Sequence, residues 1–192
     1  MSSATSQPKI FIITGPSGVG KDTVMRELQK YNLPLQRVTT TTSRPMRQGE
    51  TEGTPYHFVS EEKFNEMISA GQFAEYARVF NSYKGISRNE LEEVKNGNQG
   101  VLLQLDYQGA RTILKQYPQT IVIVITPPSI EILTTRLTQR GDKQNEELAK
   151  RLEQNKHWPQ DYLGFHHYIV NEQDHPEVAA AAVAEIIKKS LN

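Results

Sequence analysis

The sequence predicts an α/β protein with a parallel sheet flanked by helices, and two observations carry this prediction. Apolar, strand-like runs alternate along the chain with helix-like segments, an order that is typical of a parallel sheet with helices on both faces. The first of these runs, about 9–14, is apolar on both faces, as a central parallel strand should be. With 192 residues, the chain suits a single domain that can bury a substantial core.

The composition excludes several classes of partner and of site. Lys plus Arg and Asp plus Glu number 22 each, so no net charge favours nucleic acid or an anionic membrane. There is no cysteine, which excludes disulfides and thiolate metal sites. The start, 1–7, is polar, and the apolar run 10–13 is too short to cross a bilayer or to act as a signal core. We therefore expect a soluble cytoplasmic protein without nucleic-acid or membrane partners.

Apolar runs, helical periodicity and capping residues predict the elements in order. Ser60 is a candidate cap for a helix at 61–70, where Phe64, Met67 and Ile68 form an apolar stripe. In the first half of the chain we expect strands at 9–14, 37–42, 56–59 and 73–80 and helices at 21–31, 61–70 and 88–96. In the second half we expect strands at 101–106, 120–125 and 167–170 and helices at 108–117, 129–140, 145–157 and 178–191.

The segment between the first strand and the first helix has the spacing of a phosphate-binding loop. It reads Gly15-Pro16-Ser17-Gly18-Val19-Gly20-Lys21. Glycines allow backbone conformations that other residues avoid, and they leave room for a phosphate. The N–H groups of the loop and the helix N-terminus can then bind phosphate oxygens, and Lys21 can reach the outer phosphates. We expect an ATP site here; the alternative is a glycine-rich turn without a ligand.

The residue after this lysine departs from the usual pattern. That position is normally Ser or Thr, whose hydroxyl binds Mg²⁺. Here it is Asp22, and Thr23 follows. A carboxylate is also a hard oxygen ligand, and it is favourable in the first turn of a helix. Two roles therefore stay open for Asp22: binding Mg²⁺, directly or through water, and capping the helix.

Residues 37–86 interrupt the alternation of strands and helices. We expect them to fold over the phosphate loop, at the carboxyl ends of the parallel strands, where ligands gather in such folds. Within this segment Arg44 and Arg47 lie three apart in a turn rich in Pro and Gly. Two guanidinium groups so placed suit an oxyanion, which they can bind in bidentate geometry. For an isolated arginine pair the alternative is a solvated basic turn.

Further motifs follow the phosphate loop in order. After GPSGVGK at 15–21 come TSRPMRQGE at 42–50, YHFVS at 56–60, FAEYA at 73–77, LDYQGA at 105–110, PPS at 127–129, RL and RG within 136–141, RL at 151–152 and VN at 170–171. This succession resembles the guanylate kinase family, almost from end to end. The resemblance implies a P-loop NTPase-type sheet with an inserted subdomain that binds the nucleoside monophosphate (NMP) and a helical lid. It also implies transfer of the γ-phosphoryl group of ATP to GMP, with Mg²⁺ as the cofactor.

By this resemblance, Arg44, Arg47 and Tyr56 hold the phosphate of GMP, whereas Glu75 and Asp106 hydrogen-bond the edge of guanine. Guanine presents N1–H and N2–H₂ donors, which a carboxylate can accept in parallel. Asp106 ends an apolar strand, where an unpaired acid is costly. The alternative for Glu75 is an exposed acid at a strand edge. The GMP site implied in full comprises Thr40, Ser43, Arg44, Arg47, Tyr56, Glu75, Lys84 and Asp106.

The resemblance also implies that a lid carrying Arg140 and Arg151 closes over the transferring phosphoryl group. Transfer spreads negative charge over several oxygens, which pre-positioned cations stabilise. For either arginine alone, the alternative is a surface salt bridge. Asn171 matches a position close to the adenine of ATP. The implied ATP site comprises Gly15, Pro16, Ser17, Gly18, Val19, Gly20, Lys21, Asp22, Thr23 and Asn171, and the implied catalytic set comprises Lys21, Arg44, Arg140 and Arg151.

Three further positions depart from the family pattern. Lys84 stands where the family usually has a second phosphate-binding tyrosine, and Ile86 replaces a Ser or Thr that touches the base. Gln104 replaces the first acid of an Asp-x-Asp pair, which removes a charged partner of hydrated Mg²⁺. Asp22 would restore one carboxylate to the surroundings of the metal, and we treat this exchange as a hypothesis.

We expect one guanylate-kinase-like domain over 1–192, as a monomer or a homodimer, with ATP and GMP as its small-molecule substrates. Its expected parts are a core at about 8–36, 98–139 and 165–192, an NMP-binding subdomain at about 37–90 and a lid at about 140–160. One alternative is a kinase resembling ribose 1,5-bisphosphate phosphokinase, which the intact TSRPMRQGE stretch with Glu75 and Asp106 disfavours. The other is a non-catalytic guanylate-kinase-like binding module, which the joint presence of Lys21, Arg140 and Arg151 disfavours.

Overall fold

Two five-stranded sheets organise the computed structural model of the chain, which describes residues 8–47, 49–97, 99–139, 145–172 and 175–191. The first sheet is parallel throughout. Its strands are, in spatial order, β10 (His167–Val170), β9 (Ile121–Thr126), β1 (Ile10–Thr14), β8 (Gly100–Gln104) and β2 (Leu35–Arg37). The central position of β1 follows from its sequence, because all five of its residues are buried.

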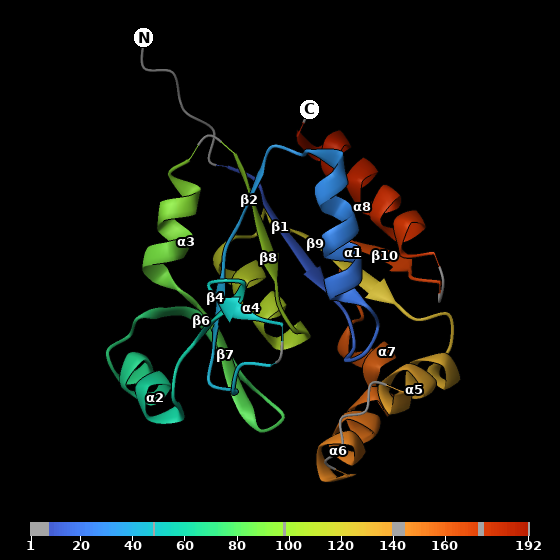
Figure 1. The fold of residues 1–192 in the computed structure, drawn as a ribbon. Coiled ribbons are helices and arrows are strands. Elements are labelled where there is room, and N and C mark those ends of the chain that lie inside the picture. The colour runs from blue at the N-terminus through green and yellow to red at the C-terminus, as the bar shows by residue number, and fades with distance from the viewer. Residues whose placement is uncertain (1–7, 48, 98, 140–144, 173–174, 192) are drawn as a thin grey trace.

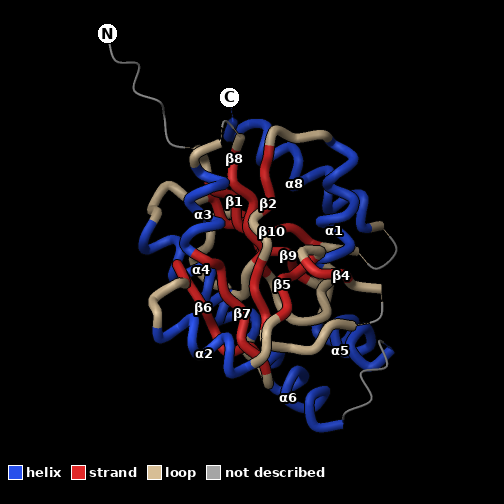
Figure 2. The backbone as a smooth tube through the Cα atoms, turned by 60° about the vertical axis from the view of Figure 1, so that its left-hand side comes forward, coloured by secondary structure: helices blue, strands red, loops and turns tan. Residues whose placement is uncertain are grey.

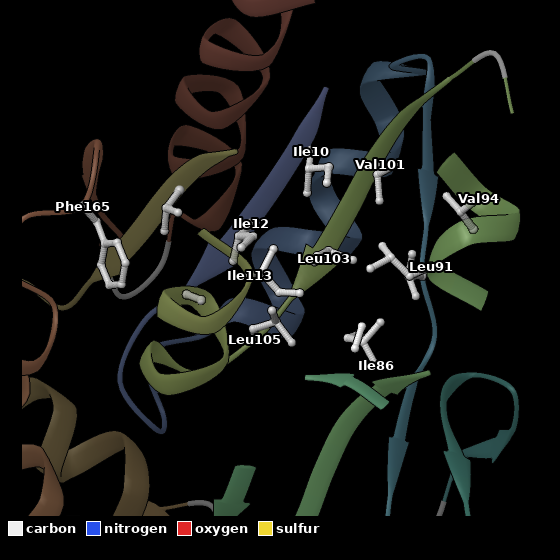
Figure 3. Close-up of a cluster of buried hydrophobic side chains, with 14 of the residues drawn as sticks. Ile10, Ile12, Ile86, Leu91, Val94, Val101, Leu103, Leu105, Ile113 and Phe165 are labelled. Carbon is white, nitrogen blue, oxygen red and sulfur yellow. The ribbon is translucent and has the colours of Figure 1, made fainter. Parts of the chain in front are cut away.

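Strand β1 divides the hydrophobic core into two layers, because its side chains alternate between the faces of the sheet. Phe11 and Ile13 pack on one face with side chains of α1 (Lys21–Leu28) and α8 (Pro176–Leu191). Ile10 and Ile12 pack on the other face with α3 (Arg88–Lys95) and α4 (Tyr107–Gln116). Figure 1 shows these helix pairs on opposite sides of the sheet, and Figure 3 shows the second layer in detail. The predicted parallel sheet flanked by helices is thus confirmed.

The second sheet is built from the segment that interrupts the alternation. Its strands are, in spatial order, β4 (Thr51–Glu52), β5 (Pro55–Phe58), β3 (Thr40–Thr42), β7 (Ser82–Ser87) and β6 (Phe73–Val79). Strands β6 and β7 form an antiparallel hairpin, whereas β3 and β5 are parallel. Helix α2 (Glu61–Ser69) begins at Ser60, whose Oγ accepts a hydrogen bond from the N–H of Lys63 at 3.1 Å, as expected of a cap. This sheet lies beyond the carboxyl edge of the first (Figure 2).

The prediction of a single strand at 37–42 is wrong, because the two ends of this segment belong to different sheets. The N–H of Val38 still donates to the carbonyl of Leu102 in the first sheet. The N–H of Thr39 donates instead to the side chain of Glu90, at 2.8 Å, and pairing in the second sheet begins at Thr40. A side chain thus takes the place of a strand partner at the crossing point. The β4 and β7 strands were not predicted either.

The chain between β9 and β10 forms helices α5 (Ile130–Gln139), α6 (Asn145–Lys156) and α7 (Trp158–Asp161). Near the start of the chain, the 3₁₀ turn Gln29–Tyr31 extends α1. Helix α7 was not predicted as a separate element. Figure 1 shows α5, α6 and α7 gathered beside the carboxyl edge of the first sheet, facing the second sheet. In the part of the chain that the structure describes, no helix has the length and apolar character needed to cross a bilayer.

Candidate active site

A cavity of about 820 Å³ lies where the carboxyl edge of the first sheet, the second sheet and helices α6 and α7 meet. The structure brings most of the predicted site residues to its wall: Gly15, Pro16, Ser17, Gly18, Lys21, Asp22, Thr40, Ser43, Arg44, Arg47, Tyr56, Glu75, Lys84, Asp106 and Arg151. Among the described residues predicted for the site, Val19, Gly20, Thr23 and Asn171 do not line it. Arg140 falls outside the described residues.

The phosphate-binding loop joins β1 to α1 and depends on its glycines. A Cβ atom on Gly15 would lie 2.2 Å from the backbone oxygen of Ile125, so the loop can approach strand β9 only without a side chain there. Gly20 has a φ of 95° and caps α1, with its carbonyl accepting from the N–H of Val24. The ammonium of Lys21 donates to the carbonyls of Gly15 and Pro16, at 2.7 and 2.9 Å. The lysine is therefore held over its own loop, with its charge at the cavity wall.

Asn171 lies behind the loop rather than in the cavity. It is 4 % exposed, and its Nδ2 donates to the carbonyl of Val19 at 2.8 Å, while a Cβ on Gly20 would lie 2.5 Å from the same nitrogen. Arg136 donates to the backbone oxygens of both Val19 and Asn171, at 3.2 and 3.0 Å. These two side chains fix the backbone of the loop. Within the described chain the Oδ1 of Asn171 is buried without a hydrogen-bond partner.

Two of the positions that depart from the family pattern contact each other. The side-chain amide of Gln104, at the end of β8, donates to Oδ1 of Asp22 in the first turn of α1, at 2.7 Å. The Oε1 of Gln104 accepts from the guanidinium of Arg37, at the end of β2, at 3.0 Å. Asp22 and Gln104 both line the cavity. Arg37, which was not singled out in the sequence, thus completes a chain of three polar side chains.

Three cations and a tyrosine gather on the second-sheet side of the cavity. The guanidinium of Arg44 is bound by both carboxylate oxygens of Glu50, at 2.7 and 2.5 Å, and lies 5.0 Å from the ring centre of Tyr56. Burial opposes the charge of Arg44, but the Glu50 carboxylate outweighs it and raises the pKa. The ammonium of Lys84 donates to the hydroxyl of Tyr56 at 3.3 Å, and Arg47 is exposed. Two cations, Arg44 and Lys84, therefore lie 5.0 Å from the centre of the Tyr56 ring.

Glu75 and Asp106 meet at the first turn of α4. Asp106 caps this helix by accepting from the N–H of Gly109 at 2.9 Å. A Cβ on Gly109 would lie 2.6 Å from a carboxylate oxygen of Glu75, so the glycine makes room for the acid. Glu75 is only 4 % exposed, and in the described chain no group donates a hydrogen bond to its carboxylate. Burial, and secondarily the charge of Asp106, raises the pKa of Glu75 to about 8. It is therefore not an exposed edge acid.

Ile86 pairs with Glu75 across β6 and β7 but belongs to the hydrophobic core. It is fully buried and lies close to Leu91 (Figure 3), so it offers nothing polar to the cavity. The adjacent Ser87 does not replace the missing hydroxyl, because its Oγ caps α3 by accepting from the N–H of Glu90 at 3.2 Å.

Helix α6 brings two buried polar side chains to the cavity. Arg151 is 8 % exposed, and its guanidinium lies 5.3 Å from the ring centre of Phe80, at the tip of the β6–β7 hairpin. One turn later, Asn155 donates to the carbonyl of Ser17 at 3.1 Å. Neither Phe80 nor Asn155 was predicted. The spacing of four residues from Arg151 in a predicted helix could have indicated Asn155, whereas nothing local indicated Phe80.

The guanylate kinase family model matches residues 7–190. The chain belongs to the guanylate kinase family. A guanylate kinase of Symbiobacterium thermophilum is 38 % identical over 183 residues, 94 % of this chain and 84 % of the relative. One from Thermosynechococcus vestitus is 43 % identical over 155 residues, 80 % of this chain and 81 % of the relative.

A solved structure agrees with this membership. The crystal structure of guanylate kinase from Anaplasma phagocytophilum matches with a TM-score of 0.73 and 27 % sequence identity. The match covers 96 % of this chain and 86 % of that one. Both the resemblance inferred from the motifs and the fold are therefore confirmed.

The described residues also indicate what kind of metal site the cavity could hold. They contain no group of three or more His, Asp or Glu side chains that could bind a metal ion. A magnesium ion that accompanies nucleotide phosphates needs only one or two protein carboxylates, because water and phosphate supply its other ligands. Asp22, in the first turn of the helix that follows the loop, is a donor of this kind.

Proposed function

We propose that this member of the guanylate kinase family performs its reaction in the cavity described above, with its tasks divided among four groups of side chains. The chain is an ATP:GMP phosphotransferase, which transfers the γ-phosphoryl group of ATP to GMP and gives ADP and GDP. The observation that carries the assignment of roles is the convergence of the phosphate loop, the Arg44–Tyr56–Lys84 cluster and the buried acid Glu75 on a single cavity.

The donor side is the phosphate loop. Its N–H groups and the N-terminus of α1 bind the phosphates of ATP, and Lys21 neutralises the outer ones. The two carbonyls that hold Lys21 keep its ammonium at the mouth of the loop. Arg136 and Asn171 support the loop from behind, and the buried Oδ1 of Asn171 is an acceptor that has no partner within the described chain. Adenine has an exocyclic amine that could donate to it.

The acceptor side combines a cationic phosphate site with an acidic base site. Arg44, Arg47, Lys84 and the Tyr56 hydroxyl surround the phosphate of GMP, and Glu50 positions Arg44 for it. Glu75, once ionised, accepts the N1–H and N2–H₂ donors of guanine, and Asp106 lies beside it at the start of α4. Thr40 and Ser43 line the same wall. Because Ile86 contributes no hydroxyl, discrimination between bases rests mainly on the two acids.

Transfer itself needs charge stabilisation more than a protein nucleophile. Arg151 lines the cavity from α6 and can stabilise the negative charge that spreads over the transferring group. Arg140 has the same proposed role. Magnesium, when bound, would supply positive charge that neutralises the phosphates of the nucleotide. We assign its protein ligand to Asp22, directly or through water.

The proposed division of the chain is the one expected from the sequence: a core at about 8–36, 98–139 and 165–192, an NMP-binding subdomain at about 37–90 and a lid at about 140–160. A cytoplasmic location and a monomeric or homodimeric state also remain predictions.

The decisive experiment measures ADP release with a coupled assay and compares GMP, dGMP, AMP and ribose 1,5-bisphosphate as phosphoryl acceptors. We expect turnover with GMP to exceed that with AMP and with ribose 1,5-bisphosphate by about 100-fold or more, because only guanine satisfies both acids. The Lys21→Ala variant is the negative control: it should lose nearly all phosphoryl transfer while its melting temperature stays unchanged. Preferred turnover of ribose 1,5-bisphosphate would overturn the assignment of the acceptor site.

A further inference from the structure

We propose that Gln104, held by Arg37, is a positioning residue that sets the Asp22 carboxylate beside the nucleotide phosphates and their magnesium ion. This inference rests on the proposed role of Asp22 as the metal ligand. It concerns Gln104, whose amide bonds to Asp22, and Arg37, which bonds to Gln104.

The hydrogen bonds of Arg37, Gln104 and Asp22 fix the orientation of the Gln104 amide. Arg37 can only donate hydrogen bonds, and an ionised Asp22 can only accept them. An amide satisfies both neighbours in one orientation, with its oxygen toward Arg37, at 3.0 Å, and its nitrogen toward Asp22, at 2.7 Å. The reverse orientation would place N–H against N–H and oxygen against oxygen. Gln104 is therefore the link that holds Oδ1 of Asp22 at a defined place.

The chemistry of this link suits a metal ligand better than an ion pair would. A carboxylate in direct contact with a guanidinium forms a strong, charge-neutralising pair. Here the amide separates the charges of Arg37 and Asp22, so the hydrogen bond that Gln104 gives to Asp22 comes from a neutral donor, and Arg37 does not neutralise the carboxylate by direct contact. Partners of this kind, which hold a ligand without touching the metal, orient it and tune metal affinity.

The sequence supports the same conclusion. Positions 22 and 104 lie 82 residues apart, on α1 and at the end of β8, and both depart from the family pattern. The resemblance drawn from the motifs implies a hydroxyl at the first position and an acid at the second. In this chain the acid is at the first, and the second has an amide that bonds to it. The two departures are thus complementary, and Arg37 adds a third side chain that fixes the amide.

The test measures metal binding rather than turnover. The affinity of Mn²⁺, as a substitute for Mg²⁺, for the complex of the full chain with ATP is read from the electron paramagnetic resonance signal of free Mn²⁺. The variants are Asp22→Asn, Gln104→Ala, Arg37→Ala and the double variant Asp22→Asn with Gln104→Ala. Gln36→Ala is the matched control, because Gln36 is an exposed amide beside Arg37 on β2. ATP affinity without metal and melting temperature are measured for each variant.

We expect Gln104→Ala to weaken Mn²⁺ binding by about 10-fold, the lower end of the 10- to 100-fold cost of losing a partner that orients a metal ligand. Arg37→Ala should weaken it less, by about 3-fold, because Arg37 acts through Gln104. The double variant should bind Mn²⁺ no more weakly than Asp22→Asn alone, since Gln104 acts only through Asp22. The Gln36→Ala control should match the parent, and ATP affinity without metal should change little in all variants.

The outcomes separate this inference from the role proposed for Asp22. If Asp22→Asn weakens Mn²⁺ binding but Gln104→Ala leaves it unchanged, the positioning role is overturned and the Asp22 assignment survives. If Asp22→Asn itself has no effect, the Asp22 assignment fails, and the inference fails with it. If Gln104→Ala lowers the melting temperature, Gln104→Met takes its place, because Met keeps the length of the side chain without its hydrogen bonds. The positioning role is then overturned if Gln104→Met leaves Mn²⁺ affinity unchanged.

Discussion

The side-chain amide of Asn155 donates a hydrogen bond to the backbone oxygen of Ser17 at 3.1 Å, and so joins helix α6 to the phosphate-binding loop. Asn155 is 4 % exposed and lies one turn after Arg151, so the two residues share a face of the helix and line the same cavity. The position of the proposed catalytic arginine is therefore coupled to the position of the loop that is proposed to bind ATP.

Replacement of Asn155 by Ala should lower kcat more than it raises KM for GMP. The substitution removes the bond between α6 and the loop but no proposed contact with GMP, and loss of a hydrogen bond that positions a transition-state group reduces rate by about 10-fold. The measurement is steady-state kinetics with GMP varied at saturating ATP. Lys156→Ala is the control, because Lys156 lies on the same helix and makes only an exposed ion pair with Glu153. Equal kcat values for the parent and Asn155→Ala would show that the hydrogen bond between Asn155 and Ser17 does not contribute to catalysis.

Replacement of Arg44 by Ala should raise KM for GMP much more than KM for ATP, by about 10- to 100-fold, because a charged hydrogen bond to the acceptor phosphate is lost. Arg47→Ala should have a smaller effect within this range, since Arg47 is exposed while Arg44 is held by Glu50 against Tyr56. Initial rates over a grid of both substrates give the two constants. Arg78→Ala, at an exposed arginine of the same sheet, is the control. Similar increases in both KM values would contradict an acceptor-phosphate role.

Glu75 should make the stability of the ligand-free protein depend on pH. Its pKa is about 8 in the folded chain and near 4.5 in the unfolded one. Because the folded value is the higher, the contribution of Glu75 to stability is fully present below about pH 4.5 and is lost as the pH rises through about 8. The free energy of unfolding, measured in urea, should therefore fall over this window more steeply for the parent than for Glu75→Gln. Parallel curves for the two proteins would contradict the raised pKa.

The same proton should be released when GMP binds, because only the ionised carboxylate can accept both guanine donors. Between about pH 7 and 8, above the second pKa of a phosphate ester near 6, the affinity for GMP should rise with pH, by at most about 10-fold per unit. Calorimetry in buffers of different ionisation enthalpy should detect the released proton. Glu75→Gln should bind GMP more weakly and without this pH dependence, which controls for titration of other groups.

Gly109→Ala should raise KM for GMP without loss of stability. The new methyl group would lie 2.6 Å from the carboxylate of Glu75, which can move because it is the end of a flexible side chain. Within helix α4 the change from Gly to Ala is itself favourable, by about 1 kcal/mol. We expect KM for GMP to rise by about 10-fold, the effect of losing a hydrogen bond to a charged group. Ala110, also buried in α4, provides the control variant Ala110→Gly, which should lower stability rather than GMP binding.

Local patterns in the sequence were sufficient for the phosphate loop, the parallel sheet and most helices. Apolar runs specify buried strands, and the loop carries its own glycines and lysine. The division of residues 37–42 could not be predicted, because a run of threonines favours a strand without indicating which sheet it joins. That choice depends on Leu102 and Glu90, which lie more than fifty residues away in the chain.

The sequence indicated most residues of the site one by one, but not the hydrogen bonds that join them. The sequence indicated Asp22 and Gln104 as separate departures from the family pattern. They lie 82 positions apart in the chain, and only the fold brings them into contact. Arg37 carried no local signal at all, because an arginine at the end of a short strand is usually a solvated side chain. Ile86 was expected near the base, whereas the pleat of β7 turns its side chain into the core.

The contact between the tip of the β6–β7 hairpin and helix α6 has a consequence for the catalytic cycle. Arg151 lies over Phe80, and Lys150 reaches Asn81 at 3.4 Å, so the two walls of the cavity touch at the side away from the first sheet. We expect both nucleotides to enter, and both products to leave, only while this contact is open. The contact between the hairpin tip and α6, which aligns Arg151 for the transfer, would then also delay the departure of GDP and ADP. In a fast enzyme this contact can therefore be neither very strong nor very weak.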